Sequence, residues 1–267
     1  MKDLVIGTIH NYGWDKVRPY AVSLARSGYS GHKVIFALDI QDDARKNLLA
    51  MGFEIVDVNF NWDHWHVFGH KRVLDPANYL RDHIGDFRYV MWTDVSDLVF
   101  QTNPSTWLEQ NAPAPCIVAA DIGGWKIRDG NQEDEAARLG PSWLRDQVSC
   151  CWGTVAGDAK SMLAMMDHVA QCPNKLFWDE AQFNYLLRIP EFKDITRIPG
   201  PDGAWTATVA WMFETRDCFR KSTPWPVWPR MDVDRGLVVT PSGVPYAIVH
   251  QWNRSQQWTD IICNKYR

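Results

Sequence analysis

One segment of the chain reads Arg88-Tyr89-Val90-Met91-Trp92-Thr93-Asp94-Val95-Ser96-Asp97. Its aromatic and β-branched residues between Arg88 and Asp94 predict a buried strand over residues 88–93. In open α/β sheets, ligands bind in the crevice at the carboxyl ends of the strands. Asp94 and Asp97 therefore stand where a binding site is expected.

Upstream of this segment, the signals for strands and helices alternate. Short apolar runs predict strands over residues 4–8, 33–38 and 53–58. Periodic apolar residues predict helices over residues 15–27, 42–51 and 71–84, and Gly52 suits the end of the second. This alternation predicts a parallel sheet with right-handed crossovers.

Downstream of the segment, the pattern is less regular. Strands are expected over residues 117–120, 151–157 and 246–250, and helices over residues 159–171 and 180–187. Residues 123–140 predict a polar loop or flap, and the Pro-, Gly- and Trp-rich stretch 199–245 is expected to shape a pocket. Since there is no internal repeat or linker, we expect one α/β domain over residues 1–267.

Composition narrows the class of protein. The 267 residues are 46% apolar and 22% charged, which is typical of a globular protein with a real core. The net charge of -4 disfavours a nucleic-acid partner, because phosphate binding needs an excess of Lys and Arg. The sequence has no stretch of about 20 apolar residues and no signal-peptide pattern. Its six cysteines lack C-x-x-C spacing, so we expect free thiols and a cytoplasmic location.

The chemistry of two acids three residues apart points to a cation. Asp94 and Asp97 can converge on one Mg²⁺ or Mn²⁺, since hard cations prefer oxygen ligands and bind proteins through one or two carboxylates plus substrate phosphates. The cation would act as a Lewis acid on a leaving diphosphate. A turn or helix cap explains the same residues, because Asp and Ser favour both.

Four segments resemble one enzyme family. Residues 89–101 resemble the "tDvrDvvFQ" form of the DxD region in nucleotide-sugar glycosyltransferases with the GT-A fold. The start Ile9-His10-Asn11-Tyr12-Gly13-Trp14 sits where the family has its first nucleotide-binding loop. Asp179-Glu180-Ala181-Gln182-Phe183-Asn184 is similar to "D-Q-x-x-x-N", and Val249-His250-Gln251-Trp252-Asn253-Arg254 resembles the closing "vHQydR". The resemblance spans residues 4–254 and implies a GT-A-type fold with a less regular C-terminal acceptor region.

The resemblance, to glycogenin-like members in particular, implies roles for individual residues. The expected ligands of Mn²⁺ or Mg²⁺ are Asp94, Asp97 and His250, with Asp97 replacing the usual second acid, whose position here is Ser96. Expected contacts to the nucleotide sugar come from Thr8, Asn11, Tyr12, Arg72, Asp94 and Ser96. The residues expected beside the donor sugar are Asp179 and Gln182. Residues 1–100 would bind the nucleotide sugar, and residues 101–267 would bind the acceptor and close the site.

The implied activity is transfer of a sugar from a nucleoside-diphosphate sugar, with UDP expected, to a glycan or another hydroxyl acceptor. The glycogenin-like ending favours retention at the anomeric carbon; an inverting enzyme would need a carboxylate base, for which Asp179, Glu180 or Asp121 could serve. Cys151-Trp152-Gly153 replaces the family's "N-S-G", so the identity of the sugar stays open. Two alternatives remain: a metal-dependent phosphohydrolase or nucleotidyltransferase, and a non-catalytic carbohydrate-binding protein, which the 15 tryptophans would suit.

Other residues carry weaker signals. Asp63-His64-Trp65-His66 and His70 could form a zinc site, but we favour loop or acceptor-site aromatics. A lone histidine such as His250 suits a structural role, and Asp179 suits a helix cap. Trp125, Trp205 and Trp211 are expected either in the core or as platforms for an acceptor sugar.

Overall fold

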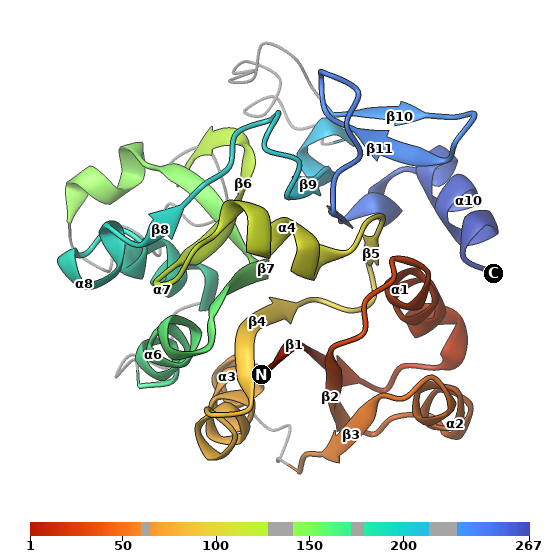
Figure 1. Ribbon diagram of the computed structural model, residues 1–267, viewed down its shortest axis with the longest axis horizontal. Helices are drawn as coiled ribbons and strands as arrows, with labels where there is room; N and C mark the ends of the chain where they lie inside the picture. The colour runs from red at the N-terminus through yellow and green to blue at the C-terminus, as the bar shows by residue number, and fades with distance from the viewer. Residues whose placement is uncertain (60–64, 128–140, 172–178, 214–228) are drawn as a thin grey trace.

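The computed structural model describes residues 1–59, 65–127, 141–171, 179–213 and 229–267 (Figure 1). Its centre is a seven-stranded sheet of order β3-β2-β1-β4-β7-β6-β8. The strands are β1 (Lys2–His10), β2 (His32–Leu38), β3 (Glu54–Asp57), β4 (Phe87–Thr93), β6 (Ile117–Lys126), β7 (Val148–Asp158) and β8 (Thr196–Arg197). β7 runs antiparallel to both its neighbours, while the other strands of this sheet share one direction. The expected mostly parallel sheet is confirmed.

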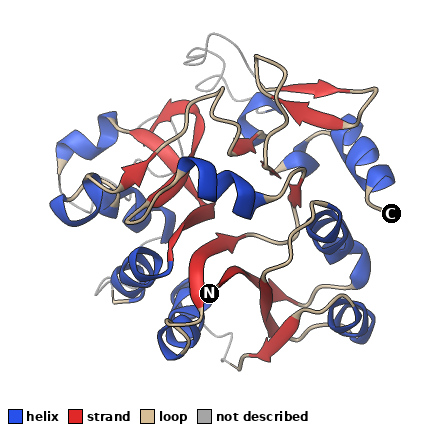
Figure 2. Ribbon diagram, in the orientation of Figure 1, coloured by secondary structure: helices blue, strands red, loops and turns tan. Residues whose placement is uncertain are grey.

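Helices cover both faces of this sheet (Figure 2). One face packs against α3 (Trp65–Asp82), α6 (Ala159–Ala170), α7 (Asp179–Leu186) and α8 (Pro190–Lys193). The other face packs against α1 (Trp14–Arg26), α2 (Asp42–Ala50) and α4 (Pro104–Asn111). Local sequence sets the ends of several helices: Asn103 and Asp158 accept hydrogen bonds as N-caps, and Gly52, with φ +76°, follows α2.

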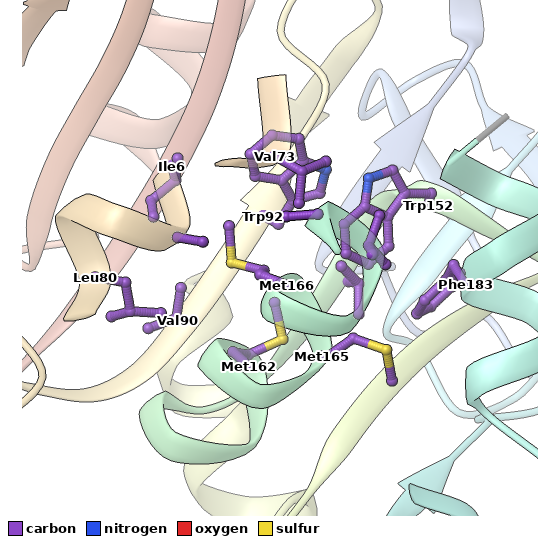
Figure 3. Close-up of a cluster of buried hydrophobic side chains, with 14 of the residues drawn as sticks. Ile6, Val73, Leu80, Val90, Trp92, Trp152, Met162, Met165, Met166 and Phe183 are labelled. Atoms are coloured by element: carbon purple, nitrogen blue, oxygen red, sulfur yellow. The ribbon is translucent and has the colours of Figure 1, made fainter. Parts of the chain in front are cut away.

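The core on the α3 and α6 face contains two tryptophans from neighbouring strands (Figure 3). Trp92 on β4 and Trp152 on β7 have ring centroids 5.8 Å apart, and Phe183 of α7 lies 4.7 Å from Trp152. Three methionines of α6 fill the space beside them: Met162, Met165 and Met166. Since burying such large rings stabilises a fold by several kcal/mol each (about 3–5 kcal/mol is lost on truncation to alanine), this cluster fixes β4, β7 and α7 relative to one another.

A second, three-stranded sheet of order β5-β12-β9 packs beside the first. Its strands are β5 (Leu98–Phe100), β12 (Ile248–His250) and β9 (Thr206–Thr208); β12 is antiparallel to β5 and parallel to β9. Because side chains alternate along a strand, Ile248 and Phe100 join the core of the large sheet while Val249 faces the other way. His250, two residues after Ile248, therefore points toward the large sheet.

The outer face of the small sheet packs on the last part of the chain. Val249 and Val99 share a cluster with residues of α10 (Gln256–Lys265) and of the hairpin β10–β11. The hairpin strands are β10 (Arg230–Asp232) and β11 (Leu237–Val239). Short 3-10 helices are η2 (Ser142–Asp146), η3 (Ala210–Phe213) and η4 (Trp252–Arg254). None of the described helices is long and apolar enough to cross a membrane.

Several elements depart from the expectation. The helix expected from Lys71 starts at Trp65, and the start of the expected flap, Gly123–Lys126, belongs to β6. The rest of that flap, residues 128–140, lies outside the described residues. The structure adds helices and strands that the periodicity did not indicate: β5, α4, α8, β8, β9, β10, β11 and α10.

Candidate functional site

The loop between β4 and β5 carries both acids and is anchored on two sides. The buried side chain of Val95 packs on Gly7 of β1, where an added Cβ would come within 2.5 Å of Val95 Cγ2. The backbone N–H of Asp94 donates to the carbonyl of Gly153 on β7, at 2.8 Å. The loop therefore has little freedom to move Asp94 away from the end of the sheet.

A bulge in β7 provides that carbonyl. The pairing of β7 with β6 shifts from Val155 opposite Ala119 to Cys151 opposite Ala120, so Trp152, Gly153 and Thr154 have no partner on β6. Such bulges free backbone groups for other contacts.

His250 ends β12 inside the protein, with none of its surface exposed. Its Nε2 lies 3.1 Å from Oδ2 of Asp94 and 3.6 Å from Oδ1 of Asp97. Its Nδ1 lies 3.6 Å from the sulfur of Cys151 on the bulged strand. Gln251 follows in the left-handed region, with φ +61°, and its N–H donates to the carbonyl of Asp97 at 2.7 Å. The end of β12 is thus tied to the acidic loop through side chains and backbone.

Asp94, Asp97 and His250 fit a divalent cation. Each offers one ligand atom, and the three atoms lie within 4.8 Å of one another. Two carboxylates and an imidazole suit Mn²⁺ or Mg²⁺. Gly153 leaves room for this convergence, because a Cβ there would come within 2.2 Å of Asp94 Oδ2 and 2.8 Å of His250 Cε1.

The charges of the site are strongly coupled. Desolvation alone would raise the pKa of Asp94, but the hydrogen bond from His250 and the nearby positive charges lower it to about 2. Burial alone would lower the pKa of His250, but the Cys151 sulfur and the hydrogen bonds to Asp94 and Asp97 raise it well above its usual range. Burial raises the pKa of the Cys151 thiol to about 12, so this group is neutral near pH 7 and the carboxylates are the charges that matter. The groups around His250 therefore stabilise its positive charge.

Arg72 reaches the site from α3. Its guanidinium lies 3.9 Å from Oδ1 of Asp94 and 5.9 Å from the centroid of the Trp92 ring. The side chain is 22% exposed. A partly exposed cation beside a carboxylate of the candidate metal site is well placed to meet a phosphate. The side chain of Lys71, which precedes Arg72 on α3 and is a second cation that could contact a diphosphate, lies outside the described residues.

Thr8, Asn11 and Tyr12 lie at the same edge of the sheet. Gly7 pairs with Thr93, so Thr8 stands level with Asp94 on the neighbouring parallel strand. Asn11 has φ +50° and is exposed, and Tyr12 is half-buried beneath Lys16 Nζ, which lies 3.7 Å from its ring centroid. The structure therefore places Thr8 level with the acidic loop, whereas the backbones of Asn11 and Tyr12 bond to Leu38 and Gln41 at the end of β2. Ser96 is half-buried within the acidic loop.

Asp179 and Gln182, the residues expected beside the donor sugar, are both on α7. The helix begins at Asp179, whose side chain lies outside the described residues, and Gln182 is half-buried. Two other side chains of this helix, which the sequence did not single out for this role, bond to β7. Oε2 of Glu180 accepts a hydrogen bond from the N–H of Trp152, at 3.4 Å, and Asn184 pairs with the backbone of Cys150. The only sequence signal for Asn184 was its place in the family pattern.

The described residues test only some of the weaker expectations. Trp125 and Trp205 are 3% and 2% exposed, so they are core residues and not platforms for a sugar. The side chain of Trp211 and those of the zinc hypothesis, Asp63 to His66 and His70, lie outside the described residues. Among the described cysteines, the free thiols are Cys116, Cys150, Cys151 and Cys263.

Comparison with solved structures identifies the architecture. The bifunctional glycosyltransferase WbbM matches with a TM-score of 0.59 and 10% identity, over 97% of this chain and 49% of that one. The galactosyltransferase LgtC, solved with donor and acceptor sugar analogues, matches with a TM-score of 0.54 and 14% identity, over 98% of this chain and 95% of that one. An active-site mutant of LgtC matches with the same TM-score and identity, over 97% and 94%. The chain has the GT-A fold.

The match rests on structure and not on sequence. No description of a known protein family and no curated protein matches the chain. The chain spans about half the length of WbbM but nearly all of LgtC. The GT-A fold expected from the four segments is confirmed, with the acidic loop at the carboxyl end of β4.

Proposed function

We propose that the chain is a metal-dependent glycosyltransferase that moves a sugar from a nucleoside-diphosphate sugar, a UDP-sugar, to a hydroxyl of a glycan. The observation that best supports this proposal is the convergence of Asp94, Asp97 and His250 at the carboxyl edge of a GT-A sheet. Its structural neighbours are glycosyltransferases, one of them solved with donor and acceptor sugar analogues. These neighbours favour sugar transfer over phosphate hydrolysis.

Asp94, Asp97 and His250 would hold Mn²⁺ or Mg²⁺. When bound, such a cation supplies a Lewis acid that offsets the charge of a departing diphosphate. The protein holds the ligands ready: Asp94 is already ionised near pH 7, and the backbone bonds of Asp94 and Gln251 fix the two ends of the site. This preorganisation avoids the cost of reorienting ligands during the reaction.

Arg72 and the β1 edge would bind the rest of the donor. The Arg72 guanidinium, always charged, would neutralise the diphosphate beside Asp94. Thr8, Asn11, Tyr12 and Ser96 would contact the nucleotide, with residues 1–100 forming the donor half and residues 101–267 the acceptor half. Binding at the carboxyl ends of parallel strands is general for open α/β sheets.

Asp179 and Gln182 would face the donor sugar from α7. We favour retention at the anomeric carbon: the C1–O bond to the diphosphate breaks with its electron pair, and the acceptor hydroxyl forms the new bond on the same face while its proton passes to a diphosphate oxygen. A carboxylate beside C1 would stabilise the positive charge that develops there.

A thermal-shift screen of nucleotides and nucleotide sugars, with and without Mn²⁺, tests the proposal. A UDP-sugar at about 100 times its Kd should add about 2.7 kcal/mol to the unfolding free energy, and only with Mn²⁺ present. Absence of stabilisation by every nucleotide tested with Mn²⁺ would contradict the proposal. Incubation of the stabilising donor with glycan acceptors then distinguishes transfer, which yields a glycosylated product, from a phosphohydrolase, which releases inorganic phosphate.

A further inference from the structure

A stripe of polar side chains joins α7 to β7. Glu180 and Asn184 of α7 and Arg188 just beyond it are spaced four residues apart, so they lie on one side of the helical turns. Their partners are the backbone groups of every second residue of the strand: Trp152, Cys150 and Val148.

The stripe stands where a neighbouring strand is missing. β4 ends at Thr93, which pairs with Thr154, and within the described part of the chain no strand pairs with β7 before Thr154 on that edge. Buried backbone groups need partners. Asn184, which is completely buried, provides both: its Oδ1 accepts from the N–H of Cys150 at 2.8 Å, and its Nδ2 donates to the carbonyl of Cys150 at 2.7 Å. The Asn184 side chain thus replaces one residue of a paired strand.

The last contact of the stripe reaches the candidate metal site. Glu180 accepts from the N–H of Trp152, and the next residue, Gly153, accepts the N–H of Asp94. Both contacts use the bulged residues that β6 leaves unpaired. α7 therefore contacts the bulge at Trp152, and the principal acid of the site contacts it at the next residue, Gly153.

We infer that Glu180 is a positioning residue for the metal site: it fixes the bulge so that the Gly153 carbonyl holds Asp94 in place. This inference rests on the metal site of the proposed function. Positioning needs a hydrogen-bond acceptor at the right reach, whereas a direct role with substrate or cation would need the negative charge. Gln keeps the reach without the charge, and Asp keeps the charge with a side chain one methylene shorter.

Mn²⁺ affinity of the folded protein, measured by electron paramagnetic resonance without any donor, separates these roles. We expect Glu180→Gln to bind Mn²⁺ as wild type does, and Glu180→Asp to bind about 10-fold more weakly, at the lower end of the effect typical of groups that orient metal ligands. Glu109→Gln, which removes a carboxylate charge from α4, is the matched control and should bind normally. Circular dichroism melts confirm that each variant is folded at the temperature used.

Three other results would contradict the inference, and each has a different meaning for the site. If both variants bind Mn²⁺ like wild type, Glu180 does not position the site, although the proposed function stands. If Glu180→Gln binds weakly, the charge is required and the positioning role is wrong. If wild-type protein itself does not bind Mn²⁺, the metal site of the proposed function fails, and this inference fails with it.

Discussion

Asp94 contacts three other elements of the candidate site: β7, β12 and α3. Its N–H bonds to Gly153, its Oδ2 bonds to His250, and its Oδ1 lies near Arg72. An amide in its place keeps the shape but removes the charge that pairs with His250. The substitution therefore separates the chemistry of the acid from its packing.

We expect Asp94→Asn to lower Mn²⁺ affinity and the rate of sugar transfer by about 100- to 1,000-fold, as is typical when a preorganised electrostatic contact is lost. Donor turnover and Mn²⁺ titration measure the effect. Asp15→Asn, which changes an acid that is 95% exposed, is the control and should leave both unchanged. Full activity of Asp94→Asn would contradict the site.

Gly153 is needed for space and not for conformational freedom. We expect Gly153→Ala to force Asp94 and His250 apart, to abolish Mn²⁺ binding, and to reduce the unfolding free energy by about 1–3 kcal/mol through overpacking. Titration with Mn²⁺ and urea denaturation provide the two readouts. Gly85→Ala, where an added Cβ meets nothing within 4 Å, is the control. Normal Mn²⁺ binding by Gly153→Ala would show that the ligands converge elsewhere.

The raised pKa of His250 predicts that metal binding depends on pH. Because its pKa is raised well above the usual range, metal-free His250 is protonated near neutral pH, and a cation binds only the neutral ring. Mn²⁺ binding should therefore release about one proton, and Mn²⁺ affinity should rise with pH until the raised pKa is passed. Asp94, with a pKa of about 2, is already ionised and adds nothing in this range. Calorimetry in buffers of different ionisation enthalpy counts the protons, and a count of zero near pH 7 would contradict the coupling.

The residues of the candidate metal site could be predicted from the sequence, but most of the contacts that support them could not. Asp94, Asp97 and His250 were expected from motif order, and the structure brings them together. The spacing role of Gly153 and the contact of Glu180 depend on a bulge, which needs the partner strand to be known and cannot be seen in one segment alone.

At the scale of elements, the contact between α7 and β7 depends on the hydrogen bonds of Asn184. Removal of its side chain leaves the N–H and carbonyl of Cys150 buried without these partners. We expect Asn184→Ala to reduce the unfolding free energy by about 2–4 kcal/mol, since each buried unsatisfied group costs about 1–3 kcal/mol. Asn111→Ala, at the exposed end of α4, should change it far less. If urea denaturation shows that Asn184→Ala lowers the unfolding free energy as little as Asn111→Ala does, the hydrogen bonds of Asn184 contribute little to stability.

Short elements escaped prediction because their partners define them. β5 has three residues, too few for a periodic pattern, and it is a strand because β12 pairs with it. β1, β2 and the helix between them, α1, were predicted because apolar runs and helical spacing are local signals. The reversed direction of β7 has no local signal, since it follows from the order of strands in the sheet.

At the scale of the whole molecule, the site joins distant parts of the chain. Asp94 and His250 are 156 residues apart and meet because the two sheets pack together. The arrangement depends on where β4 and β12 end and on how the two sheets pack. The fold is shared with LgtC at 14% identity.

The placement of β12 between β5 and β9 has a kinetic consequence. Its docking closes a very long loop, and such contacts form late in folding because their entropy cost must be met before they stabilise the chain. A cation bound by Asp94 and His250 should then act after the transition state. We expect Mn²⁺ to slow unfolding in stopped-flow experiments while leaving the refolding rate unchanged. Faster refolding with Mn²⁺ would mean that β12 docks early, and the site would then help to nucleate the fold.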